Sequence, residues 1–328
     1  MGVTDVVEEW RVSLKPIEQV AIVGAGLVGC SWAVVFAAGG ARVRIFDARP
    51  EARVEAPTRI GETLADMHRA GLCGEPQSVL SQVTVCDTLA DAVEGADYVQ
   101  ESVFERVEIK SAVCAEIGQL LIGHTVVGSS SSGIPASSFT ESVANRERFL
   151  VAHPVNPPHL IPVVELVPAP WTAPEILPWL TGELQRFGQV PVQVRSEVQG
   201  FILNRLQGAL LNEAWALFEE GYASLADIDA TVSHGLGLRW ALMGPFETID
   251  LNAPGGIGDY AQRLGPLYHD IARSRSEPRG WSRDLIERAV AERRAALPQD
   301  ALPERGRWRD RRLMQLVAHL RSAGGGEK

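Results

Sequence analysis

Short apolar runs and amphipathic stretches alternate along the first part of the chain. Gln19 to Val23 is an almost continuous apolar run, Leu27 to Ala38 is apolar over three turns of helix, and Arg42 to Phe46 alternates polar and apolar residues. The first pattern is typical of a buried parallel strand, the second of a buried helix and the third of another strand. Strand, helix and strand in this order predict the beginning of a parallel sheet covered by helices.

The alternation of strands and helices continues to about residue 197. Repetition on this scale predicts a Rossmann-type α/β fold with a doubly wound, mostly parallel sheet. The further predicted strands are 82–86, 98–103, 125–128, 149–152, 162–167 and 190–194, and the predicted helices are 50–70, 106–121 and 174–187.

After Gln199 the strand patterns end and helical patterns remain. Phe201 to Glu220 carries apolar residues at helical spacing, which predicts a long, buried helix that bridges two domains. Ser224 has the features of an N-cap for the next helix, and 282–296 predicts a further one. We therefore expect an N-terminal extension over 1–17, a sheet domain over 18–197 and an all-helical domain over 198–328.

Three glycines follow the first predicted strand in the segment Gly24-Ala-Gly26-Leu-Val-Gly29. In such a turn Gly24 permits the sharp change of direction, Gly26 lets the backbone approach a pyrophosphate, and Gly29 lets the helix pack on the strand. The first N–H groups of the helix and its dipole attract the phosphates. The segment therefore predicts a dinucleotide-binding site.

An acidic residue, Asp47, stands directly after the second predicted strand. A carboxylate at this place accepts hydrogen bonds from both ribose hydroxyls and repels a 2′-phosphate. We therefore predict NAD as the cofactor. Arg42, Arg44 and Arg49 lie nearby in the sequence, so NADP stays open at this point.

Charge and hydropathy limit the classes of partner. The formal net charge of −10 disfavours nucleic acid and anionic membranes, because an acidic surface repels both. No apolar run reaches the roughly 18 residues that span a bilayer. The first residues carry acids where a signal peptide carries bases, so we expect a cytoplasmic protein with a small-molecule substrate.

The four cysteines show no metal-binding or redox spacing. They lie in predicted helices or strands of the first domain, so we interpret them as small buried residues in a reducing compartment. No spacing of histidines and cysteines predicts a metal site. The cysteines are Cys30, Cys73, Cys86 and Cys114.

His153 stands at the end of the predicted strand 149–152, where strand ends face the crevice of an open sheet. Glu165 lies within an apolar run, so its carboxylate needs a partner. If the chain reverses after His153, Glu165 reaches one imidazole nitrogen and the other faces the substrate. Such a pair suits a base that removes an alcohol proton. The alternatives are a histidine that holds a proline-rich turn and a glutamate that faces solvent.

Polar residues at two other places are candidates for substrate contacts. The run Ser129 to Ser132 follows a predicted strand, so its hydroxyls lie at the same crevice, although a serine tract also forms turns without further function. Asn204 lies on the first turn of the long predicted helix. Its amide can bind a substrate oxygen or cap the helix.

Several longer motifs resemble those of a known family. With them the chain resembles the 3-hydroxyacyl-CoA dehydrogenase family nearly end to end, and within it the lambda-crystallin branch, which contains L-gulonate 3-dehydrogenase. The motifs are Gly24–Trp32, Gln100–Glu105, the serine run, His153–Pro168, Gly200–Gln207, Gly235–Arg239 and Gly244–Glu247.

The resemblance implies an enzyme that oxidises a 3-hydroxy acid or its thioester with NAD. It implies His153 as the catalytic base, Glu165 as its partner, and Ser132 and Asn204 as hydrogen-bond donors to the reacting oxygen. It also implies a homodimer. Apolar residues that we expect to be exposed near Leu236–Met243 favour the same assembly. The NAD contacts that it implies are Leu27, Val28, Asp47, Glu105 and Lys110.

Arg239 bears on the substrate. An arginine fork suits a free carboxylate, which a thioester lacks, so we expect a small hydroxy acid such as L-gulonate. An alternative role for Arg239 is to brace a helix. The alternative functions are a 3-hydroxybutyryl-CoA dehydrogenase, a carnitine-type dehydrogenase and a non-catalytic crystallin-like NAD-binding protein. His159, Leu160 and Trp240 stand where the branch has tyrosines, so the preferred acid can differ.

Overall fold

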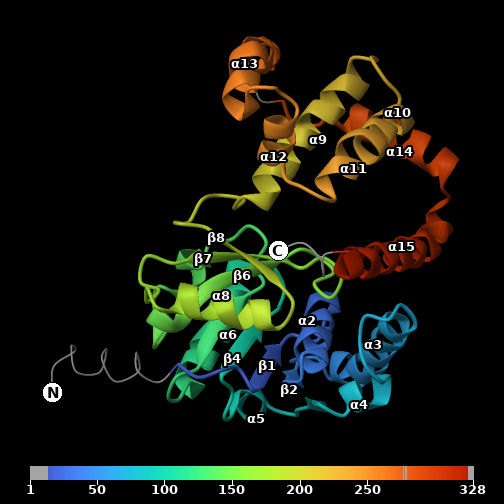
Figure 1. The fold of residues 1–328 in the computed structure, drawn as a ribbon. Helices are drawn as coiled ribbons and strands as arrows, with labels where there is room; N and C mark the ends of the chain where they lie inside the picture. The colour runs from blue at the N-terminus through green and yellow to red at the C-terminus, as the bar shows by residue number, and fades with distance from the viewer. Residues whose placement is uncertain (1–13, 276, 278, 324–328) are drawn as a thin grey trace. The chain divides into compact units, whose positions relative to one another are not determined.

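The computed structural model describes residues 14–275, 277 and 279–323 (Figure 1). Residues 1–13 of the predicted N-terminal extension therefore lie outside the described part. The described residues form two compact units. The sheet unit contains the described residues up to Leu206 and again from Gly306 to Ala323, and the helical unit contains those within Gln207–Arg305. The sequence instead suggests a single boundary at 197/198, because no local pattern reveals that the last helix returns to the first unit.

The sheet unit is built on one eight-stranded sheet with the order β3-β2-β1-β4-β5-β6-β7-β8. All neighbouring strands are parallel except β6 and β7, which are antiparallel. The predicted Rossmann-type, mostly parallel sheet is confirmed. The strands are β1 (Gln19–Val23), β2 (Arg42–Phe46), β3 (Val83–Val85), β4 (Tyr98–Glu101), β5 (Val126–Ser129), β6 (Phe149–Pro154), β7 (Val163–Pro168) and β8 (Val190–Gln193).

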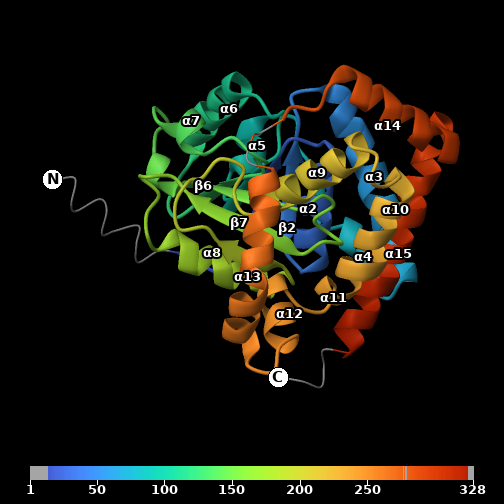
Figure 2. The ribbon, with the colours of Figure 1, turned by 90° about the horizontal axis from the view of Figure 1, so that it is seen from above.

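Helices cover both faces of this sheet, as Figure 2 shows for α6 and α7 on one side and α8 on the other. Successive side chains of β1 point to opposite faces of the sheet, because side chains alternate in direction along a strand. Val20 and Ile22 join the core under α2, α3 and α8, whereas Ala21 and Val23 join the core under α5, α6 and α7. The helices are α2 (Leu27–Ala38), α3 (Pro50–Arg69), α4 (Pro76–Leu80), α5 (Leu89–Val93), α6 (Val107–Leu120), α7 (Ser137–Thr140), α8 (Ile176–Arg186) and α15 (Leu302–Ala323).

The helical unit contains no strand among its described residues. The predicted long helix is present as α9 (Leu203–Glu219), but the prediction that it is buried is wrong, since Phe218 is its one buried residue and Leu206 is 63% exposed. Helical spacing predicts an apolar face and does not reveal what covers it. The other helices are α10 (Leu225–Ala230), a π-helical segment (Thr231–Leu236), α11 (Gly237–Trp240), α12 (Pro245–Leu251), α13 (Gly256–Ser274) and α14 (Arg283–Ala296).

Two long helices, α13 and α15, have no counterpart among the predicted elements. Pro266 stands inside α13, and proline normally ends a helical pattern. In α15 the many arginines obscure the apolar spacing. None of the described helices is long and apolar enough to cross a membrane.

The cysteines are free thiols in the structure. Cys30, Cys86 and Cys114 are buried as expected, whereas Cys73 is half-buried. Cys73 lies in a bend between α3 and α4 and not in a helix or strand, which corrects the prediction for this residue.

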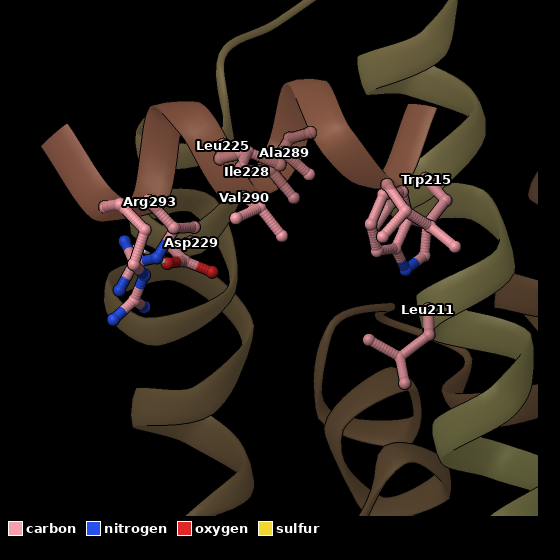
Figure 3. Close-up of a pocket in the computed structure, with 11 residues that line it drawn as sticks. Leu211, Trp215, Leu225, Ile228, Asp229, Ala289, Val290 and Arg293 are labelled. Carbon is pink, nitrogen blue, oxygen red and sulfur yellow. Dashed lines mark hydrogen bonds and ion pairs between the residues drawn. The ribbon is translucent and has the colours of Figure 1, made fainter. Parts of the chain in front are cut away.

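A groove of about 410 Å³ lies between α9, α10 and α14 in the helical unit (Figure 3). Its lining is mostly apolar, with Leu211 and Trp215 at one end. Asp229 and Arg293 form an ion pair of 3.5 Å at the other end. None of the residues that the sequence analysis singles out for chemistry lines this groove, so the candidate site lies elsewhere.

Candidate active site

A cavity of about 670 Å³ opens at the carboxyl ends of β1 and β2. The turn after β1, the residues after β2 and the segment Ser102–Phe104 after β4 form its walls. This is the edge at which open α/β sheets bind their ligands. Of the residues predicted to bind the dinucleotide, the lining includes Gly24, Gly26, Leu27, Val28 and Asp47.

The three glycines of the turn have different surroundings. Gly24 has a φ of +108°, and a Cβ there would lie 2.5 Å from the carbonyl oxygen of Ser102. A Cβ on Gly29 would lie 1.8 Å from the carbonyl oxygen of Gly24, so the fold itself requires both glycines. A Cβ on Gly26 would meet nothing within 4 Å. The space beside Gly26 is therefore open to a ligand such as a pyrophosphate.

Asp47 is held rigidly at the end of β2. Its Oδ2 accepts a hydrogen bond from the backbone N–H of Ala25 at 2.8 Å, and its Oδ1 accepts one from the backbone N–H of Arg49 at 2.9 Å. The carboxylate thus ties the end of β2 to the glycine turn while it lines the cavity. A fixed carboxylate beside an open glycine turn fits the adenosine ribose and pyrophosphate of NAD.

The arginines near Asp47 do not form a free phosphate site. The Nε of Arg49 lies 3.4 Å from Asp47 Oδ1, so this charge is paired with the carboxylate. Arg44 donates hydrogen bonds to the carbonyl oxygens of Asp91 and Glu94, at 2.8 and 3.2 Å. The lining of the cavity includes Arg49 but neither Arg42 nor Arg44.

The antiparallel pairing of β6 and β7 places His153 directly opposite Glu165. The Nδ1 atom of His153 lies 2.8 Å from Oε2 of Glu165, and both side chains are buried. The chain reversal expected after His153 is therefore present. With a residue exposure of 1%, Glu165 does not face solvent, which corrects that alternative.

Glu165 also binds the start of the segment that leads into α9. Its Oε1 accepts hydrogen bonds from the backbone N–H groups of Ile202 and Leu203, at 2.7 and 2.9 Å. Burial alone would raise the pKa of Glu165, but the hydrogen bonds from His153, Leu203 and Ile202 outweigh it and hold the pKa below its ordinary value. An ionised carboxylate can only accept, so Nδ1 of His153 is the donor in this hydrogen bond.

A second carboxylate, Glu105, organises the serine run. Its Oε1 accepts hydrogen bonds from Ser131 Oγ at 2.8 Å and from the backbone N–H groups of Ser132 and Gly133, at 2.8 and 3.2 Å. The side-chain amide of Asn204 donates to the carbonyl oxygen of Ser132. Ser132 and Asn204, which the resemblance implies as partners of the reacting oxygen, therefore lie together.

Lys110, which the resemblance implies as an NAD contact, lies between two carboxylates. Its Nζ lies 3.1 and 3.0 Å from the two carboxylate oxygens of Glu101 and 3.4 Å from Oε2 of Glu105. Its side chain is only 1% exposed and is not part of the lining of the dinucleotide cavity. Because α6 directs the lysine into the core, its charge acts on Glu105.

The pKa of Glu105 reflects this arrangement. Burial would raise the pKa, but the charge of Lys110 and the hydrogen bonds from Ser131, Ser132 and Gly133 lower it further than burial raises it. Glu105 is therefore an ionised clamp on the loop that carries Ser132.

Glu101 is a functional partner that the sequence analysis does not name. It is fully buried and also accepts hydrogen bonds from Ser129 Oγ and from the backbone N–H of Val103. The signal that identifies Glu165, a carboxylate within an apolar run, is weaker for Glu101, because Gln100 precedes it at the end of β4. Arg239, in contrast, is exposed on α11 of the helical unit.

Comparison with known proteins identifies the family. Residues 19–198 match the profile of the NAD-binding domain of 3-hydroxyacyl-CoA dehydrogenase, and residues 200–296 match the profile of its C-terminal domain. The chain belongs to the 3-hydroxyacyl-CoA dehydrogenase family. It is thus an NAD-dependent oxidoreductase that acts on CH–OH groups.

Similarity to individual proteins places the chain in the lambda-crystallin branch. It is 40% identical over 303 residues to the lambda-crystallin homolog of Bos taurus, covering 91% of this chain and 94% of that protein. It is 37% identical to the L-carnitine dehydrogenase of Streptomyces griseus over 77% of this chain and 75% of the relative. Among solved structures, the NAD-dependent dismutase 5-formyl-3-hydroxy-2-methylpyridine 4-carboxylic acid 5-dehydrogenase matches with a TM-score of 0.77, 28% identity and coverage of 95% and 100%.

Proposed function

We propose that this enzyme oxidises the 3-hydroxyl of a small hydroxy acid, L-gulonate to 3-dehydro-L-gulonate, with NAD. The observation that carries the chemistry is the buried pair of His153 and Glu165, separated by 2.8 Å at the end of β6. A base of this kind removes the hydroxyl proton while the carbinol carbon loses hydride. NAD, when bound, supplies the hydride acceptor.

The chain's own residues have three tasks in this reaction. Nε2 of His153 takes the hydroxyl proton, and Glu165 stabilises the resulting imidazolium through Nδ1–H. The hydroxyl of Ser132 and the amide of Asn204 hold the substrate oxygen as its proton leaves. The Glu105 clamp sets their positions, since it binds the backbone N–H of Ser132 and Asn204 binds the carbonyl oxygen of the same residue.

Arg239 supports a free acid over a thioester. A guanidinium binds a carboxylate through two parallel hydrogen bonds, and a thioester offers no such group. The solved relative named above acts, by its title, on a carboxylic acid, which agrees with this proposal. The second candidate is carnitine, because the similar Streptomyces protein is an L-carnitine dehydrogenase and the exposed Trp240 beside Arg239 offers an aromatic face to a trimethylammonium group.

The decisive measurement compares NADH formation from L-gulonate, L-carnitine and 3-hydroxybutyryl-CoA in the wild-type enzyme and in Arg239→Ala. We expect the highest kcat/KM with L-gulonate. In Arg239→Ala we expect the KM for L-gulonate to rise about 10- to 100-fold, because the substrate carboxylate loses one charged hydrogen-bond partner. Arg283→Ala, which removes a 90% exposed arginine of the helical unit, is the control and leaves KM unchanged. A higher kcat/KM with the thioester, or an unchanged KM in Arg239→Ala, contradicts the proposal.

We also propose that the enzyme is a homodimer through the helical unit. Leu238 and Leu242, which flank Arg239, are 63% and 71% exposed, and exposed apolar groups of this kind mark association surfaces. Light scattering is expected to give twice the mass of one chain. Leu242→Glu is expected to lower this mass to that of a monomer, whereas Ile122→Glu, at an equally exposed position of the sheet unit, does not. A monomeric wild-type enzyme refutes the proposal.

A further inference from the structure

The C-terminal helix α15 lies beyond both segments that match the family profiles, which end at residue 296. It is nevertheless an integral part of the sheet unit from Gly306 onward. Met314 is only 4% exposed and belongs to the core under α2 and α3, and Arg321 donates a hydrogen bond to the carbonyl oxygen of Leu72 at 3.4 Å. This helix therefore adds a wall that the matched domains do not contain.

The wall encloses a second cavity, of about 240 Å³, between α15, the first turns of α2, the middle of α3 and the turn after β6. It adjoins the dinucleotide cavity, because Leu27 and Asn156 line both. The volume is far above the roughly 10–15 Å³ that one water molecule needs, so a short chain of carbon atoms with hydroxyl groups can enter.

The charged groups of this cavity are largely paired. Arg309 forms an ion pair of 2.7 Å with Asp310, and Arg59 forms one of 3.1 Å with Glu55. Asp66 is paired with Arg69. Five charged residues line the cavity: Arg59, Asp66, Arg307, Arg309 and Asp310. For the guanidinium of Arg307 no partner is found among the described residues. The lining thus combines many donors and acceptors with little net charge.

His159 adds a neutral polar group to the same lining. Its Nδ1 lies 3.0 Å from the hydroxyl oxygen of Ser31, and burial lowers its pKa to about 4 against the opposing charge of Asp310. The imidazole is therefore neutral near pH 7 and can both donate and accept hydrogen bonds. Asn156 and Ser31 have the same double capacity.

This chemistry selects among the possible substrates. A hydroxyl group donates one hydrogen bond and accepts two, so a row of hydroxyls satisfies such a lining. An apolar acyl chain would offer no hydrogen bond to this lining and would displace the water that hydrates its half-buried and exposed polar groups. A quaternary ammonium would meet arginines and no aromatic cage.

We propose that the cavity under α15 binds the hydroxylated end of the substrate. The assignment rests on the proposed function and makes α15 a specificity element for sugar acids. Arg307 is the most accessible point at which to test it, because its side chain is exposed and its removal breaks no ion pair of the described structure.

The test compares L-gulonate with 3-hydroxybutyrate, which has the same carboxylate and 3-hydroxyl but no hydroxylated end. In Arg307→Leu we expect KM for L-gulonate to rise about tenfold, or about 1.4 kcal/mol, while KM for 3-hydroxybutyrate and both kcat values stay the same. Arg311→Leu, a neighbouring exposed arginine of α15 outside the cavity lining, is the matched control and changes neither KM.

The other outcomes overturn the assignment in distinguishable ways. An unchanged KM for L-gulonate in Arg307→Leu shows that the cavity does not bind this substrate. An equal rise for both substrates shows that the cavity binds the carboxylate or that α15 is displaced, and thermal unfolding of the variant separates these two causes. If the wild-type enzyme does not oxidise L-gulonate, the proposed function fails and this assignment fails with it.

Discussion

Replacement of His153 by glutamine is expected to lower kcat by about 10³-fold, within the usual range of general base catalysis, while Kd for NAD stays unchanged. Glutamine preserves much of the side chain's volume and can still bond to Glu165, but it cannot take a proton from an alcohol. The dinucleotide cavity does not include His153 in its lining, so cofactor binding has no reason to change. Stopped-flow or steady-state NADH formation measures kcat, and quenching of protein fluorescence measures NAD binding.

The matched control for this variant is His124→Gln. His124 is also paired with a carboxylate, that of Asp97 at 2.8 Å, but it lies at the opposite end of the sheet's strands, before β5. A loss of activity in His124→Gln equal to that in His153→Gln points to general loss of structure. A fully active His153→Gln removes the assignment of the base.

Glu165→Gln is expected to lower kcat by about 10³- to 10⁴-fold, as in other catalytic pairs in which an acid that orients a histidine becomes an amide. The new amide can still accept the N–H groups of Ile202 and Leu203 through its oxygen. Its NH₂ group then faces Nδ1 of His153, which must become an acceptor. The imidazole proton moves to Nε2, the atom that has to receive the substrate proton.

The same variant has an expected effect on pH-dependent stability. The pKa of Glu165 is lowered in the folded state, so its ionised form stabilises the fold above the unfolded pKa, about 4.3, and this contribution is lost as pH falls through the lower folded pKa. In urea denaturation at a series of pH values, the difference in unfolding free energy between wild type and Glu165→Gln is expected to shrink below about pH 4.3. Glu108→Gln, at a 78% exposed glutamate, is the control and gives no such difference. A difference that is independent of pH contradicts the assigned ionisation.

Local patterns were sufficient for much of the sheet unit. The predicted bounds of β1 and β2 agree with the structure to the residue, and the glycine turn lies where the spacing predicts it. These features depend on periodicity and on steric demands within a few residues, which are written directly in the sequence. The pairing of His153 with Glu165 was accessible for a similar reason, because one chain reversal brings residues of adjacent strands together.

Features that depend on distant contacts were not accessible. The enclosure of Lys110 by Glu101 and Glu105 requires the placement of α6 against β4, which no local pattern reveals. Short helices such as α4 and α5 have too few residues for a period to be recognised.

Amino-acid order therefore specifies the strands, the dinucleotide turn and the pairing of His153 with Glu165, since neighbouring residues and strands create those signals. The ionised clamp on Ser132 and the cavity walled by α15 exist only in the folded chain. Arg321 reaches Leu72 across 249 positions, and Asn204 reaches Ser132 across 72. Burial and hydrogen bonding between distant segments stabilise such contacts, and no local periodicity in the sequence shows which segments will meet.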